Sequence, residues 1–195
     1  MNLKEIIRKV MQREVTPPEG EVWVTEVCGC LRRAWFKRRF GEEVTKDMIA
    51  GIKGHDILLP RLAEELGCAY EVRIEIPVND HVLVGKADLV CDDRVIELKI
   101  SNSLHIRDEW VLQANTYAVA LGKDKFTIAV IGNSIVTEDF KANRALFKVV
   151  LEATKTYIKY LKGDVPPPPM RGDWCKYCPY RKECNKEKSI TEYMR

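Results

Sequence analysis

Two carboxylates and a lysine are the residues of this chain whose spacing most clearly allows chemistry. Asp88 lies in the segment GKADLV, Glu97 and Lys99 lie in RVIELKI, and the residues Asp92 and Asp93 separate the two segments. Both segments are rich in strand-forming residues, and Asp tolerates turn conformations. The sequence therefore predicts an antiparallel hairpin at this position.

The register of this hairpin decides whether the charged groups meet. A two-residue loop at Asp92 and Asp93 gives the pairs Cys91–Arg94, Val90–Val95, Leu89–Ile96 and Asp88–Glu97. Directly opposed residues have Cβ atoms about 4.5–5.5 Å apart on one face of the sheet. Lys99 lies two residues beyond Glu97 and shares that face. A shift of one residue would turn Asp88 away from Glu97.

A cluster of this kind is either a metal site or a solvated part of the surface. Acidic residues on strands are usually solvated, and a Glu-x-Lys sequence is common in a charged chain. Like charges that oppose each other on a sheet are destabilising unless something neutralises them. A divalent cation does so, and carboxylates beside a lysine suit hydrolysis assisted by Mg²⁺ or Mn²⁺.

The neighbouring helices carry further polar side chains. His55 lies on the apolar stripe of a helix expected over 45–66, where a histidine is either a satisfied core residue or a ligand that reaches the carboxylates. Gln113 and Tyr117 are four residues apart on the next helix, and this spacing places them on one face. They fit an ordinary amphipathic helix, or a site that holds a phosphate or a nucleotide.

A second group of candidate residues consists of cysteines near the C-terminus. Cys175, Cys178 and Cys184 have two and then five residues between them, and three thiolates need a fourth ligand from elsewhere. The pair Cys28 and Cys30 is the expected source. A three-plus-one arrangement of thiolates favours an iron–sulfur cluster over zinc, whose sites usually come as two close pairs. Either metal would join the two ends of the chain.

The remaining cysteines, Cys68 and Cys91, are interpreted as small apolar residues. The N-terminal segment MNLKEIIRKVMQRE lacks the apolar core and the cleavage site of a signal peptide, and no apolar run approaches the roughly 20 residues that span a bilayer. We therefore expect a cytoplasmic protein with no membrane partner and no disulfide bond. The net charge of +3 does not by itself demand a nucleic-acid partner.

The order of the expected elements predicts an α/β fold. In chain order they are helices over 2–12, 25–39 and 45–66, strands over 71–78, 81–90 and 94–100, a helix over 106–121, strands over 126–132 and 135–140, and a helix over 141–161. A strand–helix–strand crossover from 94–100 to 126–132 indicates a parallel pair. The proline run that begins at Pro166 forms a stiff linker to the Cys-rich tail.

Six short motifs resemble the RecB-type nucleases of the P-D-(D/E)-x-K superfamily. They most closely resemble the CRISPR-associated exonuclease family that is fourth in the Cas naming series. Over residues 25–184 the motifs are CLRRAWF, GIKGHDIL, GKADLV, IELK, QANTY and WCKYCPYRKEC. They resemble that family's Cys-Pro-Arg-Arg/Lys-x-Trp motif, helical His motif, Gly-x-x-Asp strand, Glu-x-Lys strand, Gln-x-x-x-Tyr helix and three-cysteine tail. Leu31 stands where the family usually has proline.

The resemblance implies a fold and a set of residue roles. The fold is a restriction-endonuclease-like, RecB-type core over 1–165, a mixed sheet flanked by helices, with a helical iron–sulfur module over 166–195 that joins the two ends of the chain. Mg²⁺ or Mn²⁺ would be held by His55, Asp88, Glu97 and the carbonyl of Leu98, with Lys99 helping to activate the attacking water. Gln113 and Tyr117 would support the site and contact DNA. The cluster, with four irons or two, would be held by Cys30, Cys175, Cys178 and Cys184.

The resemblance also implies an activity. It is a metal-dependent exonuclease reaction on single-stranded DNA or on DNA with single-stranded overhangs, which trims fragments before a CRISPR integrase inserts them. Such a substrate needs a basic groove with stacking aromatics, for which Trp35, Phe36 and Tyr117 are candidates. Two alternatives are a non-catalytic DNA-binding adaptor of the integrase and a stand-alone repair nuclease with a zinc staple.

Overall fold

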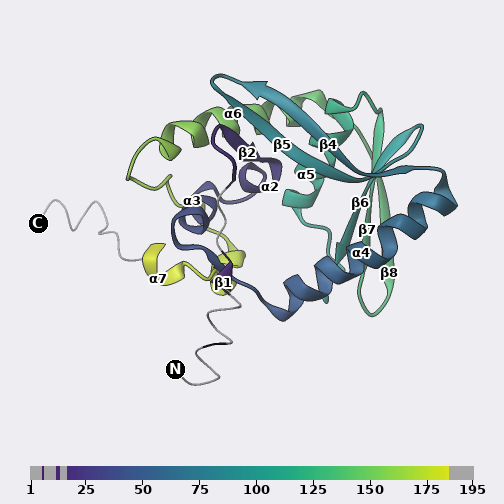
Figure 1. The fold of residues 1–195 in the computed structure, drawn as a ribbon, viewed down its shortest axis with the longest axis horizontal. Coiled ribbons are helices and arrows are strands. Elements are labelled where there is room, and N and C mark those ends of the chain that lie inside the picture. The colour runs from purple at the N-terminus through teal and green to yellow at the C-terminus, as the bar shows by residue number, and fades with distance from the viewer. Residues whose placement is uncertain (1–5, 7–11, 14–16, 185–195) are drawn as a thin grey trace, which may run out of the picture.

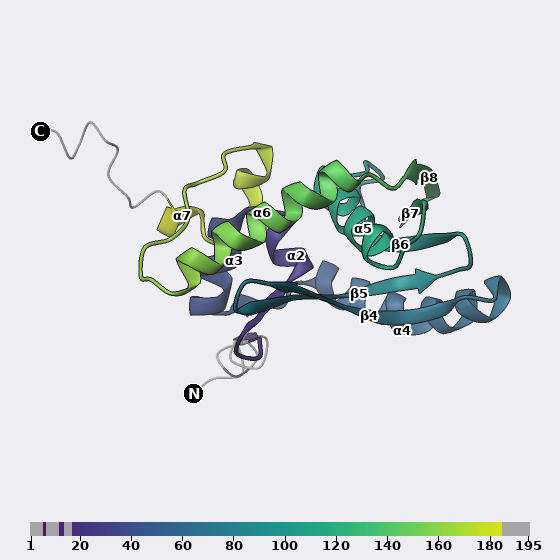
Figure 2. The ribbon, with the colours of Figure 1, turned by 90° about the horizontal axis from the view of Figure 1, so that it is seen from above.

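A mixed sheet lies between helices on its two faces in the computed structural model, which describes Ile6, residues 12–13 and residues 17–184. Figure 1 and Figure 2 show α4 on one side of β4 and β5, and α5 and α6 on the other side. This is the α/β architecture that the sequence predicts, a restriction-endonuclease-like core. No helix within the described residues combines the length and the apolar character that a membrane crossing requires.

The strands are β1 (Gln12–Arg13), β2 (Glu21–Trp23), β3 (Glu42–Glu43), β4 (Ala69–Val78), β5 (His81–Val90), β6 (Arg94–Ile100), β7 (Lys125–Ile131) and β8 (Ile135–Lys141). The helices are α2 (Val24–Val27), α3 (Leu31–Phe40), α4 (Lys46–Leu66), α5 (Asp108–Ala120), α6 (Arg144–Leu161), the 3₁₀ helix η1 (Asp173–Tyr177) and α7 (Arg181–Cys184). Residues 185–195 of the expected C-terminal module, and most of the helix expected over 2–12, lie outside the described residues.

The central part of the sheet follows the predicted pattern. β4 pairs with β5, β5 with β6, and β7 with β8, all antiparallel. β6 and β7 are parallel with α5 between them in the chain, which confirms the predicted crossover. Both α4 and α5 pack against β6, and Glu97 on this strand is buried.

The N-terminal part differs from the single helix expected over 25–39. β2 pairs in parallel with β5, and two helices, α2 and α3, then follow with a break between them at Cys28–Cys30. A strand of three residues is too short to show an alternating pattern in the sequence, so it was not predicted. The break leaves Cys30 at the N-terminal end of α3.

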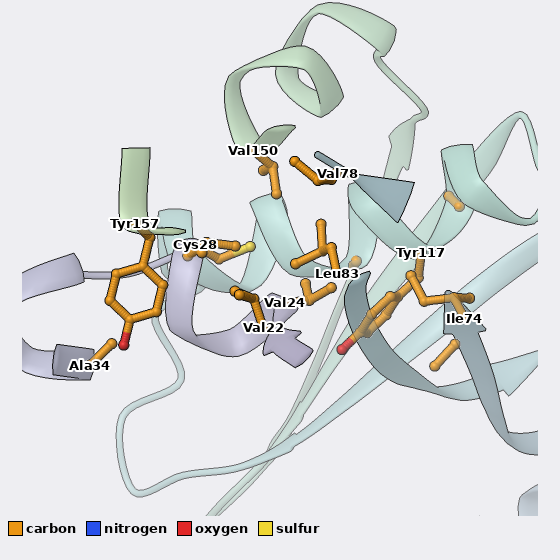
Figure 3. Packing of buried hydrophobic residues seen from close by; sticks show 14 of the residues in the cluster. Val22, Val24, Cys28, Ala34, Ile74, Val78, Leu83, Tyr117, Val150 and Tyr157 are labelled. Atoms are coloured by element: carbon orange, nitrogen blue, oxygen red, sulfur yellow. The ribbon is translucent and has the colours of Figure 1, made fainter. Parts of the chain in front are cut away.

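Two hydrophobic clusters hold the helices to the sheet. The larger one joins α2, α3, α5 and α6 to the sheet, and Figure 3 shows Leu83, Tyr117 and Tyr157 within it. The smaller one joins α4 to β5 and β6 through the buried residues Leu59, Ala63, Leu89 and Leu98. The helix that carries His55 is therefore attached through a limited apolar contact.

Cys68 and Cys91 form a disulfide bond, which corrects the expectation of two small apolar thiols in a chain without disulfides. The register of β4 against β5 pairs Ala69 with Val90, so the next pair outward brings the two cysteines opposite each other. Their Cα atoms are 4.4 Å apart, close to the spacing of a non-hydrogen-bonded pair of an antiparallel ladder. The bond joins the segment that follows α4 to the turn between β5 and β6.

The N- and C-terminal parts of the described chain lie side by side. Both ribbon views place α7 beside α3 (Figure 1 and Figure 2). The hydroxyl of the buried residue Tyr180 donates to the carbonyl of Gly41, and its ring lies 5.8 Å from that of Phe36. On α3, Trp35 also donates through Nε1 to the carbonyl of Tyr160 at 3.1 Å. Protein contacts therefore position the Cys-rich segment against α3.

Candidate functional site

The hairpin of β5 and β6 opens at Asp88. The predicted register holds up to the pair Leu89–Ile96, where the ladder ends. In a continued ladder the N–H of Leu98 would donate to the backbone of β5, but it donates to Oδ2 of Asp88 at 2.8 Å. Beyond this point β5 pairs with β2. The Asp88 carboxylate therefore lies where two strands separate, and it contacts the backbone of β6.

Glu97 is buried in the same opening, with 0% of its surface exposed. Its Oε1 accepts a hydrogen bond from Nζ of Lys99 at 2.6 Å. Its Oε2 has no hydrogen-bond partner among the described residues. A buried carboxylate oxygen without a partner is costly, so this atom is a natural ligand for a cation.

His55 reaches the same opening from α4. Its Nε2 donates to the carbonyl of Leu98 at 2.9 Å, and its Nδ1 lies 3.7 Å from Oδ1 of Asp88. Burial, together with the charge of Lys99, lowers the pKa of His55. The ring is therefore neutral near pH 7, and with its proton on Nε2 it presents the lone pair of Nδ1 to Asp88. Nδ1 of His55 and Oδ1 of Asp88 are then two electron-rich atoms that face each other, and a cation close to both would be stabilised.

The charges of the site are not balanced. Burial raises the pKa of Asp88 and that of Glu97, and the charge of Asp88 raises the pKa of Glu97 further. Burial acts to lower the pKa of Lys99, but the neighbouring carboxylates outweigh it and the net shift is upward. One ammonium thus faces two carboxylates, and the site gains from an additional positive charge.

Gln113 and Tyr117 support the lysine. Lys99 donates through Nζ to Oε1 of Gln113 at 3.1 Å, and Nε2 of Gln113 donates to the hydroxyl of Tyr117 at 3.2 Å. The shared face predicted from their spacing is confirmed. The expected contact with DNA is not, because both side chains are buried, Tyr117 with 1% exposed. Trp35 and Phe36 are also buried, so none of the three expected stacking rings faces solvent.

The donor set fits a hard divalent cation. Carboxylate and carbonyl oxygens with one imidazole are ligands that Mg²⁺ and Mn²⁺ accept. Within the part of the chain that the structure describes, no group of three or more His, Cys, Asp or Glu side chains is placed so that it could hold a metal ion. Lys99 is hydrogen-bonded to Oε1 of Glu97, and His55 to the carbonyl of Leu98. A cation would compete with these two hydrogen bonds and would satisfy Oε2 of Glu97.

The cysteines form a separate group. A cavity of about 260 Å³ between α3 and the Cys-rich segment is lined by Cys30, Cys175, Cys178 and Cys184. Burial raises the pKa of Cys184, and the other three thiols add to the shift, so the four groups are close enough to interact. The four thiols share one cavity, but as they stand they do not form a group that could hold a metal ion.

Cys28 is placed differently from Cys30. Figure 3 shows it within the hydrophobic core, and burial raises the pKa of its thiol to about 12. A thiol must ionise before it binds metal. The sequence left open whether Cys28 or Cys30 is the fourth cysteine of the group. The position of Cys30 at the cavity and the raised pKa of Cys28 both favour Cys30.

Comparison with known proteins places this geometry in a family. The profile of the PD-(D/E)XK nuclease superfamily matches residues 3–185. The chain belongs to the PD-(D/E)XK nuclease superfamily. Among curated proteins, no sequence is significantly similar to it. The superfamily typically uses a divalent metal such as Mg²⁺ or Mn²⁺, in agreement with the donor set described above.

Solved structures share the fold of this PD-(D/E)XK protein. SSO0001 has a TM-score of 0.70 and 21% identity, covering 97% of this chain and 99% of its own. The alkaline exonuclease LHK-Exo from Laribacter hongkongensis has a TM-score of 0.56 and 15% identity, covering 81% and 92%. A phage-related exonuclease from Haemophilus somnus has a TM-score of 0.51 and 12% identity, covering 80% and 98%. At these identities the likeness shows the fold.

Sequence reasoning missed two features of this PD-(D/E)XK site. One is the hydrogen bond from the Leu98 N–H to Asp88, which only the separation of β5 from β6 allows. The other is the hydrogen bond from Lys99 to Gln113. The shared face of Gln113 and Tyr117 was visible in the sequence, but the position of α5 above β6 was not.

Proposed function

We propose that this protein is a Mg²⁺- or Mn²⁺-dependent DNA exonuclease that acts on single-stranded DNA or on single-stranded overhangs. The observation that carries the proposal is the unpartnered, buried Oε2 of Glu97, next to a carboxylate and a carbonyl that face the same opening. A superfamily of nucleases and exonuclease relatives with the same fold support it. One of the LHK-Exo structures is a complex with dAMP.

Each residue of the opening has a role in this proposal. His55, Asp88, Glu97 and the carbonyl of Leu98 would hold the cation. When bound, the cation supplies Lewis acidity toward the phosphate and lowers the pKa of water. Lys99, kept charged by the carboxylates and oriented by Gln113, stabilises the negative charge that develops as water attacks the phosphorus. The strand opening gives these groups fixed positions before the substrate arrives.

The test is cleavage of end-labelled single-stranded DNA with Mn²⁺ and with Mg²⁺. We expect the wild type to shorten the DNA from an end, and Glu97→Ala and Lys99→Ala to lose activity by at least about 100-fold, as for removal of a preorganised electrostatic group. Lys155→Ala is the matched control, because this partly exposed lysine on α6 pairs only with Glu152 among the ion pairs of the described residues. Full activity in Glu97→Ala and Lys99→Ala would refute the proposal.

We further propose that Cys30, Cys175, Cys178 and Cys184 hold an iron–sulfur cluster, with four irons favoured over two. Their shared cavity supports a tetrathiolate site, and the three-plus-one spacing favours a cluster over zinc. Anaerobic purification followed by metal analysis and a visible spectrum tests this. A colourless protein with about one zinc ion and no iron would refute the cluster and would favour a structural zinc site at these cysteines.

The proposed biological role is the trimming of DNA fragments for a CRISPR integrase in the cytoplasm, supported by the six motifs. The division into a nuclease domain over 1–165 and a cluster module over 166–195 belongs to the same proposal. Cleavage of partial duplexes with overhangs, with and without a purified integrase, tests the role. If the integrase does not change the activity, and substrates with and without overhangs are cleaved equally, a stand-alone repair nuclease would be favoured instead.

A further inference from the structure

Two exposed aromatic side chains lie on the Cys-rich segment. Tyr177 is 88% exposed and Trp174 is 49% exposed, both on η1. Single exposed aromatic residues are common, but two exposed rings close together form a patch of the kind that contacts a partner. They contrast with Trp35, Phe36 and Tyr117, which the sequence suggested as stacking residues and which are buried.

The backbone of η1 places these two rings on one side. In a 3₁₀ helix the side chains at positions i and i+3 are eclipsed, and the rise of about 2.0 Å per residue separates them by roughly 6 Å along the axis. Trp174 and Tyr177 have this spacing and are both within η1. Trp174 also lines the cysteine cavity and Tyr177 does not, so Tyr177 is the ring that lies outside the cavity.

The orientation of Trp174 is fixed by two contacts. Its Nε1 donates to the carbonyl of Met170 at 3.3 Å. A Cβ atom at Gly172 would lie 2.3 Å from the indole ring, so the ring packs directly on the glycine backbone. A ring that is held in place while half of it stays exposed loses little conformational entropy when a flat partner stacks on it.

The surroundings of the two rings are positively charged. Residues 170–184 contain four basic and two acidic residues, and the four basic residues, Arg171, Lys176, Arg181 and Lys182, are exposed. Exposed aromatics among basic side chains match single-stranded nucleic acid, which offers both bases for stacking and phosphates for pairing. We name Arg171, Trp174, Lys176, Tyr177 and Arg181 the stacking face; all of these except Tyr177 also line the cysteine cavity.

We propose that the stacking face binds single-stranded DNA, with bases on the rings of Tyr177 and Trp174 and phosphates on the surrounding cations. This inference rests on the proposed action on single-stranded DNA and assigns a second contact outside the metal opening. The cysteine-bearing segment would then hold the strand as well as join the two ends of the chain. Loss of a stacked base contact costs on the order of 5- to 150-fold in affinity.

The experiment is fluorescence anisotropy with a labelled oligothymidine and the anaerobically purified full chain, in EDTA so that no cleavage occurs. Tyr177→Ala should weaken binding by about 5- to 150-fold, whereas Tyr177→Phe should bind like the wild type because it keeps the ring. Tyr70→Ala is the matched control, since Tyr70 is a 49% exposed tyrosine on β4. Gly172→Ala should also weaken binding, because it displaces the Trp174 ring without removing it.

An oligonucleotide with abasic sites separates stacking from other causes. The affinity difference between the wild type and Tyr177→Ala should vanish on it, and the visible spectra of all variants should match. If Tyr177→Ala loses as much affinity on the abasic strand as on oligothymidine, the stacking face is overturned. The same holds if Tyr177→Ala still cleaves DNA and loses no affinity for oligothymidine; neither outcome affects the proposed function. Unchanged DNA affinity with lost integrase binding would overturn it in favour of a protein partner. A wild type that neither binds nor cleaves single-stranded DNA would refute the proposed function itself.

Discussion

Asp88 accepts a hydrogen bond from the backbone N–H of Leu98 at 2.8 Å, in the position where a bond between strands would otherwise form. The carbonyl of the same residue, Leu98, is bound by His55 at 2.9 Å. Residue Leu98 of β6 is thus hydrogen-bonded by a side chain of β5 and by a side chain of α4. These two side chains keep β5 and β6 separated at this point. In this arrangement the carboxylate positions the strand through one oxygen, and in the proposed function it also binds the cation.

The first prediction concerns the pH dependence of stability. Asparagine at position 88 keeps an oxygen that accepts from Leu98, but it cannot ionise. Burial raises the pKa of Asp88 in the folded protein, so the folded state binds this proton more tightly than the unfolded chain does. As the pH rises from about 4 through the raised pKa, the metal-free wild type should lose stability relative to Asp88→Asn. By pH 8 the variant should be more stable by about 1–2 kcal/mol in urea unfolding with EDTA.

Mn²⁺ should reverse this order. A cation that binds only the folded wild type raises its Tm, whereas Asp88→Asn lacks one carboxylate ligand and should show a much smaller rise. Asp92→Asn, at an exposed position of the turn in the same hairpin, should behave like the wild type in both measurements. Equal responses of wild type and Asp88→Asn to pH and to Mn²⁺ would show that Asp88 is not a ligand.

The second prediction concerns the position of Lys99. Gln113→Ala removes the acceptor of a hydrogen bond from a charged group and should lower the single-turnover rate with Mn²⁺ by about 10- to 100-fold. Tyr117→Phe removes only the hydroxyl that orients Gln113, so its effect should stay within about 10-fold. Gln113→Glu keeps an acceptor and should retain more activity than Gln113→Ala. Wild-type rates in all three variants would mean that α5 does not position the lysine.

The third prediction concerns the disulfide. It closes a loop with a sequence separation of 23 residues, for which loop entropy gives about 3 kcal/mol of stability. The double variant Cys68→Ser with Cys91→Ser should lose about that amount in guanidinium unfolding. A reductant should lower the Tm of the wild type and leave that of the double variant unchanged. If the reductant leaves the Tm of the wild type unchanged, the disulfide bond is absent in solution.

The proximity of Asp88, Glu97 and Lys99 could be predicted because the signal was local. Two-residue turns and strand periodicity fix the register near Asp92, and that register placed Asp88 close to Glu97 and Lys99. The meander and the parallel crossover followed from the same periodicity. The sequence could not show that the ladder ends at Leu89, because that depends on β2, a strand of three residues from elsewhere in the chain.

The features that sequence reasoning missed are all long-range contacts. The disulfide of Cys68 depends on the register of β4 against β5, and the burial of Trp35 depends on α6 lying against α3. Neither contact leaves a periodic trace in the sequence. The same limit explains Cys28 and Cys30, which are two residues apart, yet one is in the core and the other faces the cysteine cavity.

The fourth prediction separates these two cysteines. Cys30→Ala removes a thiol from the cysteine cavity and should yield protein with little iron and a bleached visible spectrum. Cys28→Ala removes a core thiol whose pKa burial raises to about 12, so it should keep its iron and lose only about 1–2 kcal/mol of stability. The iron-to-protein ratio and the urea midpoint of the two variants, prepared in parallel, give the answer. Iron lost from Cys28→Ala and retained in Cys30→Ala would reverse the assignment, because it would mean that the break between α2 and α3 rearranges to bring the core thiol to the metal.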